Sequence, residues 1–246
     1  MATSAGQRET GLNTTRQQRR WHEFTRRGKL ETAAVGAILA SARRAIGERG
    51  LFRIVLAGGT TPREVYQALR TVETDWSAWH VYFGDERCLP PADPERNSAL
   101  ASCAWLDQVA IPRSQVHPIP AELGPARAAL FYAQELATMG EGNDFDLVLL
   151  GLGEDGHTAS LFPGQAWENA ARLPTVIPVL HAPKPPPQRV SLSPARLSGA
   201  RQVIFLVSGA DKQKALQDWR DGAAIPASRI TAAGGVDIFF STSADR

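Results

Sequence analysis

The sequence predicts an α/β fold, a single domain with a mostly parallel, Rossmann-like sheet that is flanked by helices on both faces. Two observations support this prediction. Short apolar runs at residues 52–57, 79–83, 147–150 and 203–207 have the length and content of buried strands, and helix-forming segments lie between them. Each run also ends in a loop of polar residues with glycine, and in open α/β sheets the loops at the carboxyl ends of the strands bind ligands.

Length and composition are those of a soluble globular protein. Of the 246 residues, 43% are apolar and 21% charged, and the formal net charge of +2 is too small to indicate a nucleic-acid or membrane partner. No apolar run approaches the ~20 residues of a membrane-spanning helix, and the N-terminus lacks the apolar core of a secretion signal. Two cysteines are too few for a disulfide framework or a metal cluster. We therefore expect a cytoplasmic protein without metal, either a monomer or a small homo-oligomer.

The first 20 residues are polar and aperiodic, and we expect a flexible tail there, followed by one domain over residues 21–246. Several basic residues between positions 16 and 29 make a nucleic-acid-binding arm one interpretation, but a solvated tail is the simpler one. Apolar residues at helical spacing then predict a helix over 30–48, and Gly50 suits its C-terminal end.

The first glycine loop has the sequence GGTT and leads from the strand at 52–57 into a predicted helix at 63–71. Thr61 and Glu64 match a capping box, and Pro62 occupies the favoured first helical position. Free N–H groups and the positive end of the helix dipole make an anion site at such an N-terminus. A plain capped turn is the alternative, but two glycines and two threonines exceed what a cap needs, so the pattern favours phosphate binding.

The strand predicted at 79–83 ends in GDER, which carries three charges in succession. These charges form either a solvated loop or a cluster in a binding site, where Arg87 would bind an anionic oxygen through its planar, bidentate guanidinium. Further helices are predicted at about 95–107 and 124–139, and the second leads through glycines to the strand at 147–150.

The loop GLGEDGH follows the strand at 147–150 and carries Asp155 and His157. None of the other four histidines has a comparable setting. An imidazole titrates near physiological pH, which suits a general base that acts on water, so the pattern favours a catalytic role for His157. The alternative interpretation is that His157 only forms hydrogen bonds within its own turn. The GxGxxG spacing does not indicate a dinucleotide site, because Pro163 and Gly164 cut the next helix short and no acidic residue follows at the required distance. No P-loop lysine follows either glycine loop.

The C-terminal third alternates strands and connectors. Lys212 starts a predicted helix at 211–219, Arg189 lies near the start of a strand, and the proline-rich segment APKPPP is an extended connector. Strands are predicted at 175–180, 188–192, 203–207 and 236–240, and a short element at 228–230.

Four strand ends therefore carry polar loops, with the sequences GGTT, GDER, GEDGH and SGADK. The carboxyl ends of parallel strands meet along one edge of a sheet. We expect these loops, which are remote in sequence, to form one pocket.

The segments LAGGTTP, FGDER, GLGEDGHTASLFPG and LVSGADK resemble those of the 6-phosphogluconolactonases, hydrolases of the oxidative pentose phosphate pathway. The resemblance runs from about residue 30 to residue 240. Its most specific part is HTASLFPG, because the glucosamine-6-phosphate deaminases and isomerases of the same superfamily continue differently after their DGH. The resemblance implies an enzyme without a cofactor that hydrolyses 6-phospho-D-glucono-1,5-lactone to 6-phospho-D-gluconate.

The resemblance also implies roles for particular residues. His157 would activate water against the lactone carbonyl, and Arg87 with backbone N–H groups would stabilise the oxyanion. Asp155 would orient His157 or hold a sugar hydroxyl. Asp85, at the position of a catalytic aspartate in the deaminases, would fix Arg87 or the substrate. The residues implied to bind the 6-phosphate are Gly58, Gly59, Thr60, Thr61, Arg189 and Lys212.

Two features depart from the family pattern: Glu154 stands where a small residue or proline is usual, and the sequence after the final strand is unusual and short. Two other functions remain alternatives. One is a hexosamine-6-phosphate isomerase or deaminase, against which the HTASLFPG continuation speaks. The other is a non-catalytic sugar-phosphate sensor of the kind joined to a DNA-binding module, and the N-terminal tail is too short for a helix-turn-helix.

Overall fold

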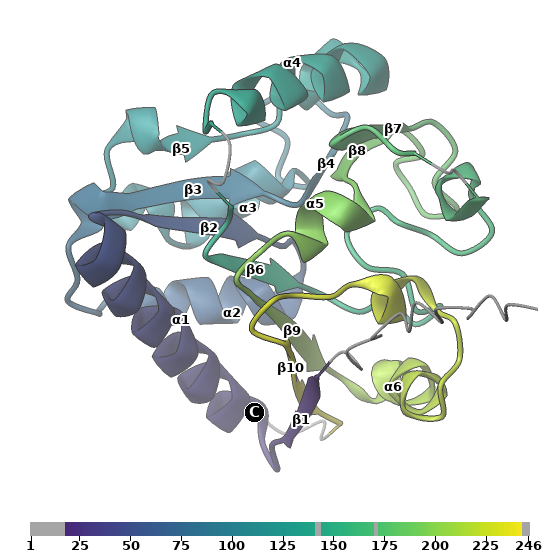
Figure 1. The fold of residues 1–246 in the computed structure, drawn as a ribbon, viewed down its shortest axis with the longest axis horizontal. Helices are drawn as coiled ribbons and strands as arrows, with labels where there is room; N and C mark the ends of the chain where they lie inside the picture. The colour runs from purple at the N-terminus through teal and green to yellow at the C-terminus, as the bar shows by residue number, and fades with distance from the viewer. Residues whose placement is uncertain (1–17, 141–143, 170–171, 243–246) are drawn as a thin grey trace, which may run out of the picture.

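The computed structural model describes residues 18–140, 144–169 and 172–242. They contain a seven-stranded sheet with the order β1-β10-β9-β6-β2-β3-β5, and every neighbouring pair is parallel (Figure 1). The predicted α/β fold with a mostly parallel sheet is confirmed. The strands of this sheet are β1 (Arg19–Glu23), β2 (Phe52–Leu56), β3 (Trp79–Phe83), β5 (Val116–His117), β6 (Leu147–Leu150), β9 (Gln202–Ser208) and β10 (Val236–Ser241).

Strand β6 lies at the centre of the sheet because it is apolar on both faces. All of its residues are buried, as are most residues of its neighbours β2 and β9. A parallel sheet that is covered on both faces needs such continuous apolar strands, which is why short apolar runs in the sequence located these strands correctly.

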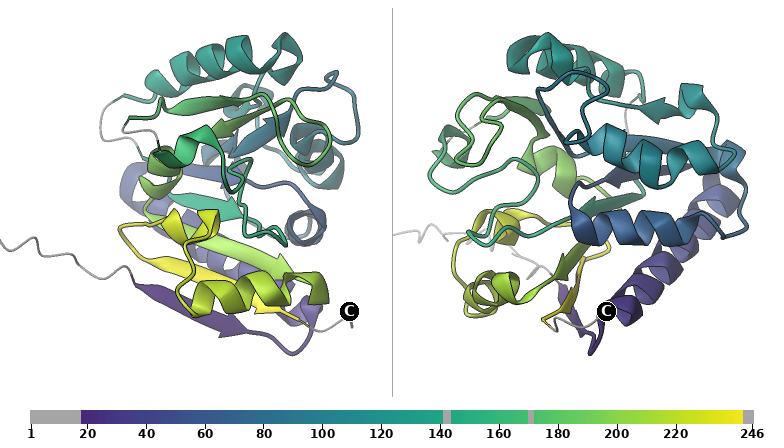
Figure 2. Two further views of the ribbon diagram at one scale, coloured as in Figure 1. Left: turned by 90° about the vertical axis from the view of Figure 1, so that its right-hand side faces the viewer. Right: turned by 180° about the vertical axis from the view of Figure 1, so that it is seen from behind.

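Helices cover both faces of this sheet. In Figures 1 and 2, α1, α2 and α3 lie together on one face and α6 lies on the opposite one. On the α6 side, Trp219 packs edge-on against Phe205 of β9 and Trp21 of β1. The helices are α1 (Arg27–Arg49), α2 (Thr60–Leu69), α3 (Asn97–Ala104), α4 (Pro125–Ala137), α5 (Pro194–Ser198) and α6 (Gln213–Arg220).

A second, antiparallel sheet of three strands was not predicted. Its order is β4 (Asp85–Arg87), β8 (Arg189–Leu192), β7 (Val176–Val179), and α4 packs on β7 and β8. The sequence indicated the last two strands but not their separate sheet. Strand β4 is short and consists of three charged residues, so no alternation of apolar and polar residues marks it.

The edge strand β1 begins inside the segment that was expected to be a tail up to about residue 20. The Arg20 guanidinium donates two hydrogen bonds of 2.7 Å to Asp237 of β10, and His22 Nε2 lies 2.8 Å from the same carboxylate. Pairing with a remote acidic residue explains why a polar segment becomes a strand. The rest of the predicted tail, residues 1–17, lies outside the described residues.

Several helix boundaries differ from the prediction. α2 begins at Thr60 rather than at residue 63, α3 is shorter than the predicted 95–107, and a short 3₁₀ turn precedes α6. The predicted element at 228–230 is the 3₁₀ turn Pro226–Arg229. Within the described ranges, no helix is both long enough and apolar enough to cross a membrane.

Candidate active site

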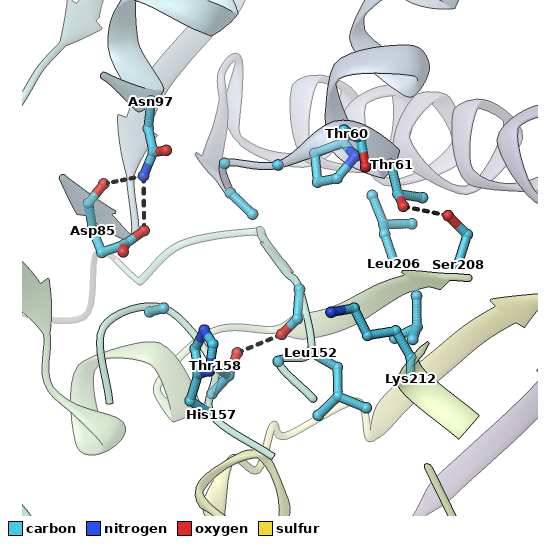
Figure 3. A pocket seen from close by; sticks show the side chains of 18 of the residues that line it. Thr60, Thr61, Asp85, Asn97, Leu152, His157, Thr158, Leu206, Ser208 and Lys212 are labelled. Atoms are coloured by element: carbon cyan, nitrogen blue, oxygen red, sulfur yellow. Dashed lines mark hydrogen bonds between the residues drawn. The ribbon is translucent and has the colours of Figure 1, made fainter. Parts of the chain in front are cut away.

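The loops after β2, β3, β6 and β9 open onto one pocket of about 240 Å³ at the carboxyl edge of the parallel sheet (Figure 3). The structure thus brings the four loops together as expected. Asp155 is the one predicted site residue that does not line the pocket, because it lies behind His157. The predicted site residues that line it are Gly58, Gly59, Thr60, Thr61, Asp85, Arg87, His157, Arg189 and Lys212.

Asp155 fixes the orientation of His157. Its Oδ1 is hydrogen-bonded to Nδ1 of His157, and it also accepts the backbone N–H of His157 at 3.3 Å. A proton on Nδ1 leaves Nε2 as the nitrogen with a free lone pair, able to accept a proton in the pocket. Of the two roles expected for Asp155, this geometry favours the orientation of His157.

The pKa of His157 lies below the usual value of about 6.5. Burial lowers it, while the hydrogen bond and the charge of Asp155 act in the opposite direction and do not fully compensate. For Asp155, burial raises the pKa, but the contacts with His157 outweigh burial, so this pKa is also lowered. At pH 7 the pair is therefore a neutral imidazole on a carboxylate, which is the protonation state of a general base.

Close contacts require glycine at two positions of this loop. A Cβ at Gly153 would lie 1.9 Å from Nδ1 of His157 and 2.6 Å from Oδ1 of Asp155. Gly156 has φ 80°, and its Cβ would lie 2.7 Å from Cβ of Ile225. In the spacing that formally matches a dinucleotide motif, Gly153 therefore makes room for Asp155 and His157, and Gly156 lets the loop pack on Ile225.

The N-terminus of α2 lines the same pocket without a side-chain cap from the described residues. Its N-cap residue, Gly59, has φ 103°, a conformation that favours glycine. Pro62 has no N–H, and Arg63 N–H donates to the Gly59 carbonyl, so Thr60 and Thr61 supply the free N–H groups of the first turn. Two such donors at the positive end of a helix are the arrangement that can bind an anion, so anion binding here stays a prediction.

The predicted capping box is wrong. Thr61 lies within the helix, and its hydroxyl forms a 2.5 Å hydrogen bond with that of Ser208 at the end of β9. Glu64 pairs instead with Arg27 of α1. Both side chains therefore bind partners that are remote in sequence. The N–H groups at the N-terminus of α2 are left without a side-chain cap from the described residues and can bind a ligand.

Three cationic residues, Arg87, Arg189 and Lys212, line the same pocket. Figure 3 shows the Lys212 ammonium pointing toward the middle of the pocket. The same ammonium forms a 2.7 Å ion pair with Asp211, which does not line the pocket. Arg87 and Arg189 are directly opposite each other in the β4–β8 pair. Like charges in such positions repel each other unless an anion lies between them, so this pair adds to the attraction for a negatively charged ligand.

Arg189 also holds the proline-rich connector. Its Nε and Nη2 donate to the carbonyl oxygens of residues 184–186 over 2.8–3.2 Å. Arg189 also lines the pocket, and among the described residues its Nη1 has no hydrogen-bond partner. The nearby Arg87 is fixed by a hydrogen bond from its Nη1 to the Glu95 carbonyl.

Asp85 is buried and braces the wall of the pocket. Its carboxylate accepts hydrogen bonds from Asn97 Nδ2 at 2.9 Å and from Ser160 Oγ at 2.6 Å, and among the described residues Arg87 is not one of its hydrogen-bond donors. Of its two expected roles, the contact with Arg87 is therefore not observed. Asn97 was not predicted as a site residue because it belongs to none of the strand-end loops, whereas Ser160 lies in the HTASLFPG segment but was given no role there.

The neighbouring Glu86 shows that GDER is not a solvated loop. Its side chain is completely buried and accepts the backbone N–H groups of Asn97 and Ser98 at 2.7 and 2.8 Å, which caps α3. Arg96 Nε lies 3.5 Å from the same carboxylate. Buried carboxylates need such partners, and the partners here position Asn97.

Glu154, the departure from the family pattern, forms a 2.8 Å ion pair with Lys184. The hydrogen bond from Lys184 lowers the pKa of Glu154, and the pairing offsets the extra negative charge beside the site. The final strand runs to Ser241, and the residues after 242 lie outside the described part of the chain. No group of three or more His, Cys, Asp or Glu residues in the described ranges is arranged to hold a metal ion.

Comparison with known proteins identifies relatives over most of the chain. Residues 25–239 match the family of glucosamine-6-phosphate isomerases/6-phosphogluconolactonase. A 6-phosphogluconolactonase of Synechocystis is 44% identical over 180 residues, which are 70% of this chain and 73% of the relative. One of Mycobacterium leprae is 39% identical over 223 residues, 85% of this chain and 89% of the relative.

Solved structures agree with these relatives. The 6-phosphogluconolactonase of Thermotoga maritima has a TM-score of 0.83 at 25% identity, covering 92% of this chain and 100% of that chain. The enzyme of Trypanosoma brucei has a TM-score of 0.77 at 27% identity, covering 92% of this chain and 97% of that chain.

Proposed function

The chain belongs to the family of glucosamine-6-phosphate isomerases and 6-phosphogluconolactonases, and we propose that it hydrolyses 6-phospho-D-glucono-1,5-lactone to 6-phospho-D-gluconate in the oxidative pentose phosphate pathway. Its curated relatives at 39–44% identity carry the name 6-phosphogluconolactonase, not isomerase. The observation that most supports this function is that a neutral His157 on Asp155 shares one pocket with the uncapped N-terminus of α2.

The 6-phosphate binds at α2 in this proposal. The backbone N–H groups of Thr60 and Thr61 donate to its oxygens, and Lys212 and Arg189 supply positive charge. Anchoring the phosphate at one end of the pocket holds the lactone carbonyl near His157, and binding energy from this remote group is used to orient the reacting carbon.

His157 then acts as the general base. Its Nε2 removes a proton from a water molecule while the water oxygen attacks C1 of the lactone, and Asp155 stabilises the imidazolium that forms. The negative charge moves to the carbonyl oxygen of a tetrahedral intermediate. Arg87 and N–H groups of the glycine loops stabilise this oxyanion in the pocket.

The intermediate collapses when the bond between C1 and the ring oxygen breaks. His157 returns its proton to the departing ring oxygen, which becomes the 5-hydroxyl of the product, and the new carboxylic acid then ionises. Water is the nucleophile and no electron is transferred, so this reaction needs no cofactor.

Hydrolysis of freshly prepared 6-phospho-D-glucono-1,5-lactone, followed by proton release against the spontaneous rate, tests the function. We expect clear acceleration and much weaker activity on the unphosphorylated lactone. A rate equal to that of buffer would contradict the proposal. Ammonia release from glucosamine 6-phosphate in a parallel assay would indicate the isomerase branch of the family instead.

The substrate is the only partner that this function requires. We propose that the protein acts in the cytoplasm as a monomer or a small homo-oligomer, without a nucleic-acid or membrane partner. Both cysteines, Cys88 and Cys103, are free thiols, as expected for a reducing compartment. Cell fractionation and light scattering of the purified protein test location and oligomeric state.

A further inference from the structure

Asn97 is a buried polar residue of the pocket wall to which the proposed mechanism gives no role. It lies at the start of α3 with 4% of its surface exposed, and it lines the pocket. Its Nδ2 donates to both the backbone carbonyl and the Oδ1 of Asp85, each at 2.9 Å. Both acceptors are oxygens, so they fix which end of the amide is the nitrogen.

The other end of the same amide faces the glycine loop. A Cβ at Gly58 would lie only 1.9 Å from Oδ1 of Asn97, so the space beside Gly58 belongs to this oxygen. Figure 3 shows the Asn97 oxygen turned away from Asp85, on the side of the amide that faces the open pocket. No described residue donates a hydrogen bond to this oxygen. The oxygen is also not sealed inside the protein, so a ligand in the pocket can reach it.

We propose that Asn97 is a specificity-determining residue whose Oδ1 accepts a hydrogen bond from a ring hydroxyl of the sugar. The inference rests on the proposed function and names a group of the substrate that the pocket recognises. Asn97 lies between the loop that holds the phosphate and the β4 segment that carries Asp85 and Arg87. A sugar whose phosphate lies at α2 and whose C1 faces His157 presents its hydroxyls to the wall between these points.

The rigidity of Asn97 makes it selective. Asp85 holds the nitrogen, Ser160 holds Asp85 at 2.6 Å, and Glu86 accepts the Asn97 backbone N–H at 2.7 Å. An acceptor that cannot rotate away is left unpaired when the ligand lacks the matching hydroxyl. A site built to bond a hydroxyl therefore rejects the analogue without it more strongly than a flexible contact would.

A purely structural role predicts something different. If Asn97 only braces Asp85, its loss weakens catalysis equally for every lactone that carries the phosphate. If its Oδ1 binds a hydroxyl, the loss is smaller for the one analogue that lacks this hydroxyl. Comparing variants and substrates in a cycle separates the two roles.

The experiment measures kcat/KM of the wild type, Asn97→Ala and Ser160→Ala on 6-phospho-D-glucono-1,5-lactone and its 2-, 3- and 4-deoxy analogues. We expect Asn97→Ala to lose on the order of tenfold on the parent lactone, the value of about one well-made hydrogen bond. On the one analogue that lacks the matching hydroxyl, kcat/KM of the wild type should be lower than on the parent lactone by about the same factor. On that analogue, Asn97→Ala should lower kcat/KM little further. Asn97→Ser takes the place of Asn97→Ala if circular dichroism shows that the alanine variant is unfolded.

Ser160→Ala is the matched control, because it removes the other hydrogen bond on the Asp85 carboxylate and leaves Oδ1 of Asn97 intact. It should keep the wild-type ratio between parent and deoxy substrates. An Asn97→Ala loss that is the same factor for the parent and all three analogues would overturn the inference.

Binding by isothermal titration separates this inference from the proposed function. The same variants are titrated with 6-phospho-D-gluconate and its deoxy analogues, which needs no turnover. If the wild type does not accelerate lactone hydrolysis but the binding cycle shows the coupling, the function is wrong and the role of Asn97 stands. If hydrolysis is accelerated but neither cycle shows coupling, the function stands and the role of Asn97 is wrong.

Discussion

Replacing Asp155 by asparagine tests how the site prepares its base. The substitution keeps the size of the side chain and removes the charge next to Nδ1 of His157. A hydrogen bond to a charged group contributes about 1.5–3 kcal/mol and a neutral one about 1 kcal/mol, so the change costs about 1–2 kcal/mol when His157 becomes positively charged. The amide of the introduced asparagine can also offer an N–H to Nδ1, which places the imidazole proton on Nε2 and blocks the base.

Together these effects predict that Asp155→Asn lowers kcat by about 30- to 1,000-fold, less than the loss of the whole base. The pH dependence gives a second readout. Asp155 raises the pKa of His157 against the effect of burial, so the variant should shift the acidic limb of kcat to lower pH. His157 in the variant stays neutral to lower pH, but it is a weaker base.

The assay is proton release from 6-phospho-D-glucono-1,5-lactone between about pH 5 and 8, with the spontaneous rate subtracted at each pH. Glu154→Gln is the matched control, since it removes a carboxylate one residue away that pairs with Lys184 and does not contact His157. We expect the control to stay within about threefold of the wild type. An unchanged kcat in Asp155→Asn, or an acidic limb that moves to higher pH, would refute the role given to Asp155.

Three further predictions concern the base, its glycine loop and the edge strand. Because burial lowers the pKa of His157, the wild-type kcat/KM should fall on acidification with an apparent pKa below about 6.5, and a limb above that value would contradict the assignment. Gly153→Ala places a Cβ 1.9 Å from Nδ1 of His157 and should lower kcat at least ~100-fold. In the control Gly151→Ala the added Cβ meets nothing within 4 Å, so the factor by which kcat falls should be at least about tenfold smaller. Equal falls in kcat would show that the clash with His157 is irrelevant. Asp237→Asn leaves Arg20 without its carboxylate and should lower the free energy of unfolding by about 2 kcal/mol in urea at pH 7. Burial raises the pKa of Asp237, but the bonds from Arg20, His22 and Gln202 outweigh it and lower this pKa, so the difference should disappear as the pH falls through and below about 3.9; an unchanged midpoint at pH 7 would contradict the pairing.

The parts of the site that were best predicted from the sequence are those whose residues lie close together in the chain. His157 and Asp155 are two residues apart in one loop, and glycines mark that loop directly after an apolar strand. The same holds for Thr60 and Thr61, where the proposed anion site depends on a helix N-terminus within the same segment. Residues that are close in sequence carry their geometry in spacing alone, so these parts needed no knowledge of tertiary contacts.

The parts that the sequence did not predict depend on remote partners. Thr61 was expected to cap its own helix, but its hydroxyl bonds Ser208, 147 residues away. Asn97 gains its place in the pocket from Asp85 and Gly58, and nothing in its own neighbourhood indicates this. Strand β1 likewise forms because Arg20 meets Asp237 of β10. Spacing cannot reveal which polar groups meet across a sheet, because those contacts follow from the packing of the whole chain.

The most direct test of the central claim is the turnover of His157→Gln on 6-phospho-D-glucono-1,5-lactone. Glutamine keeps polar atoms at this position but cannot accept a proton from water. We expect kcat to fall by about 10²- to 10⁴-fold toward the spontaneous rate, while the dissociation constant of 6-phospho-D-gluconate changes by less than about threefold. Turnover close to that of the wild type would show that another group activates the water.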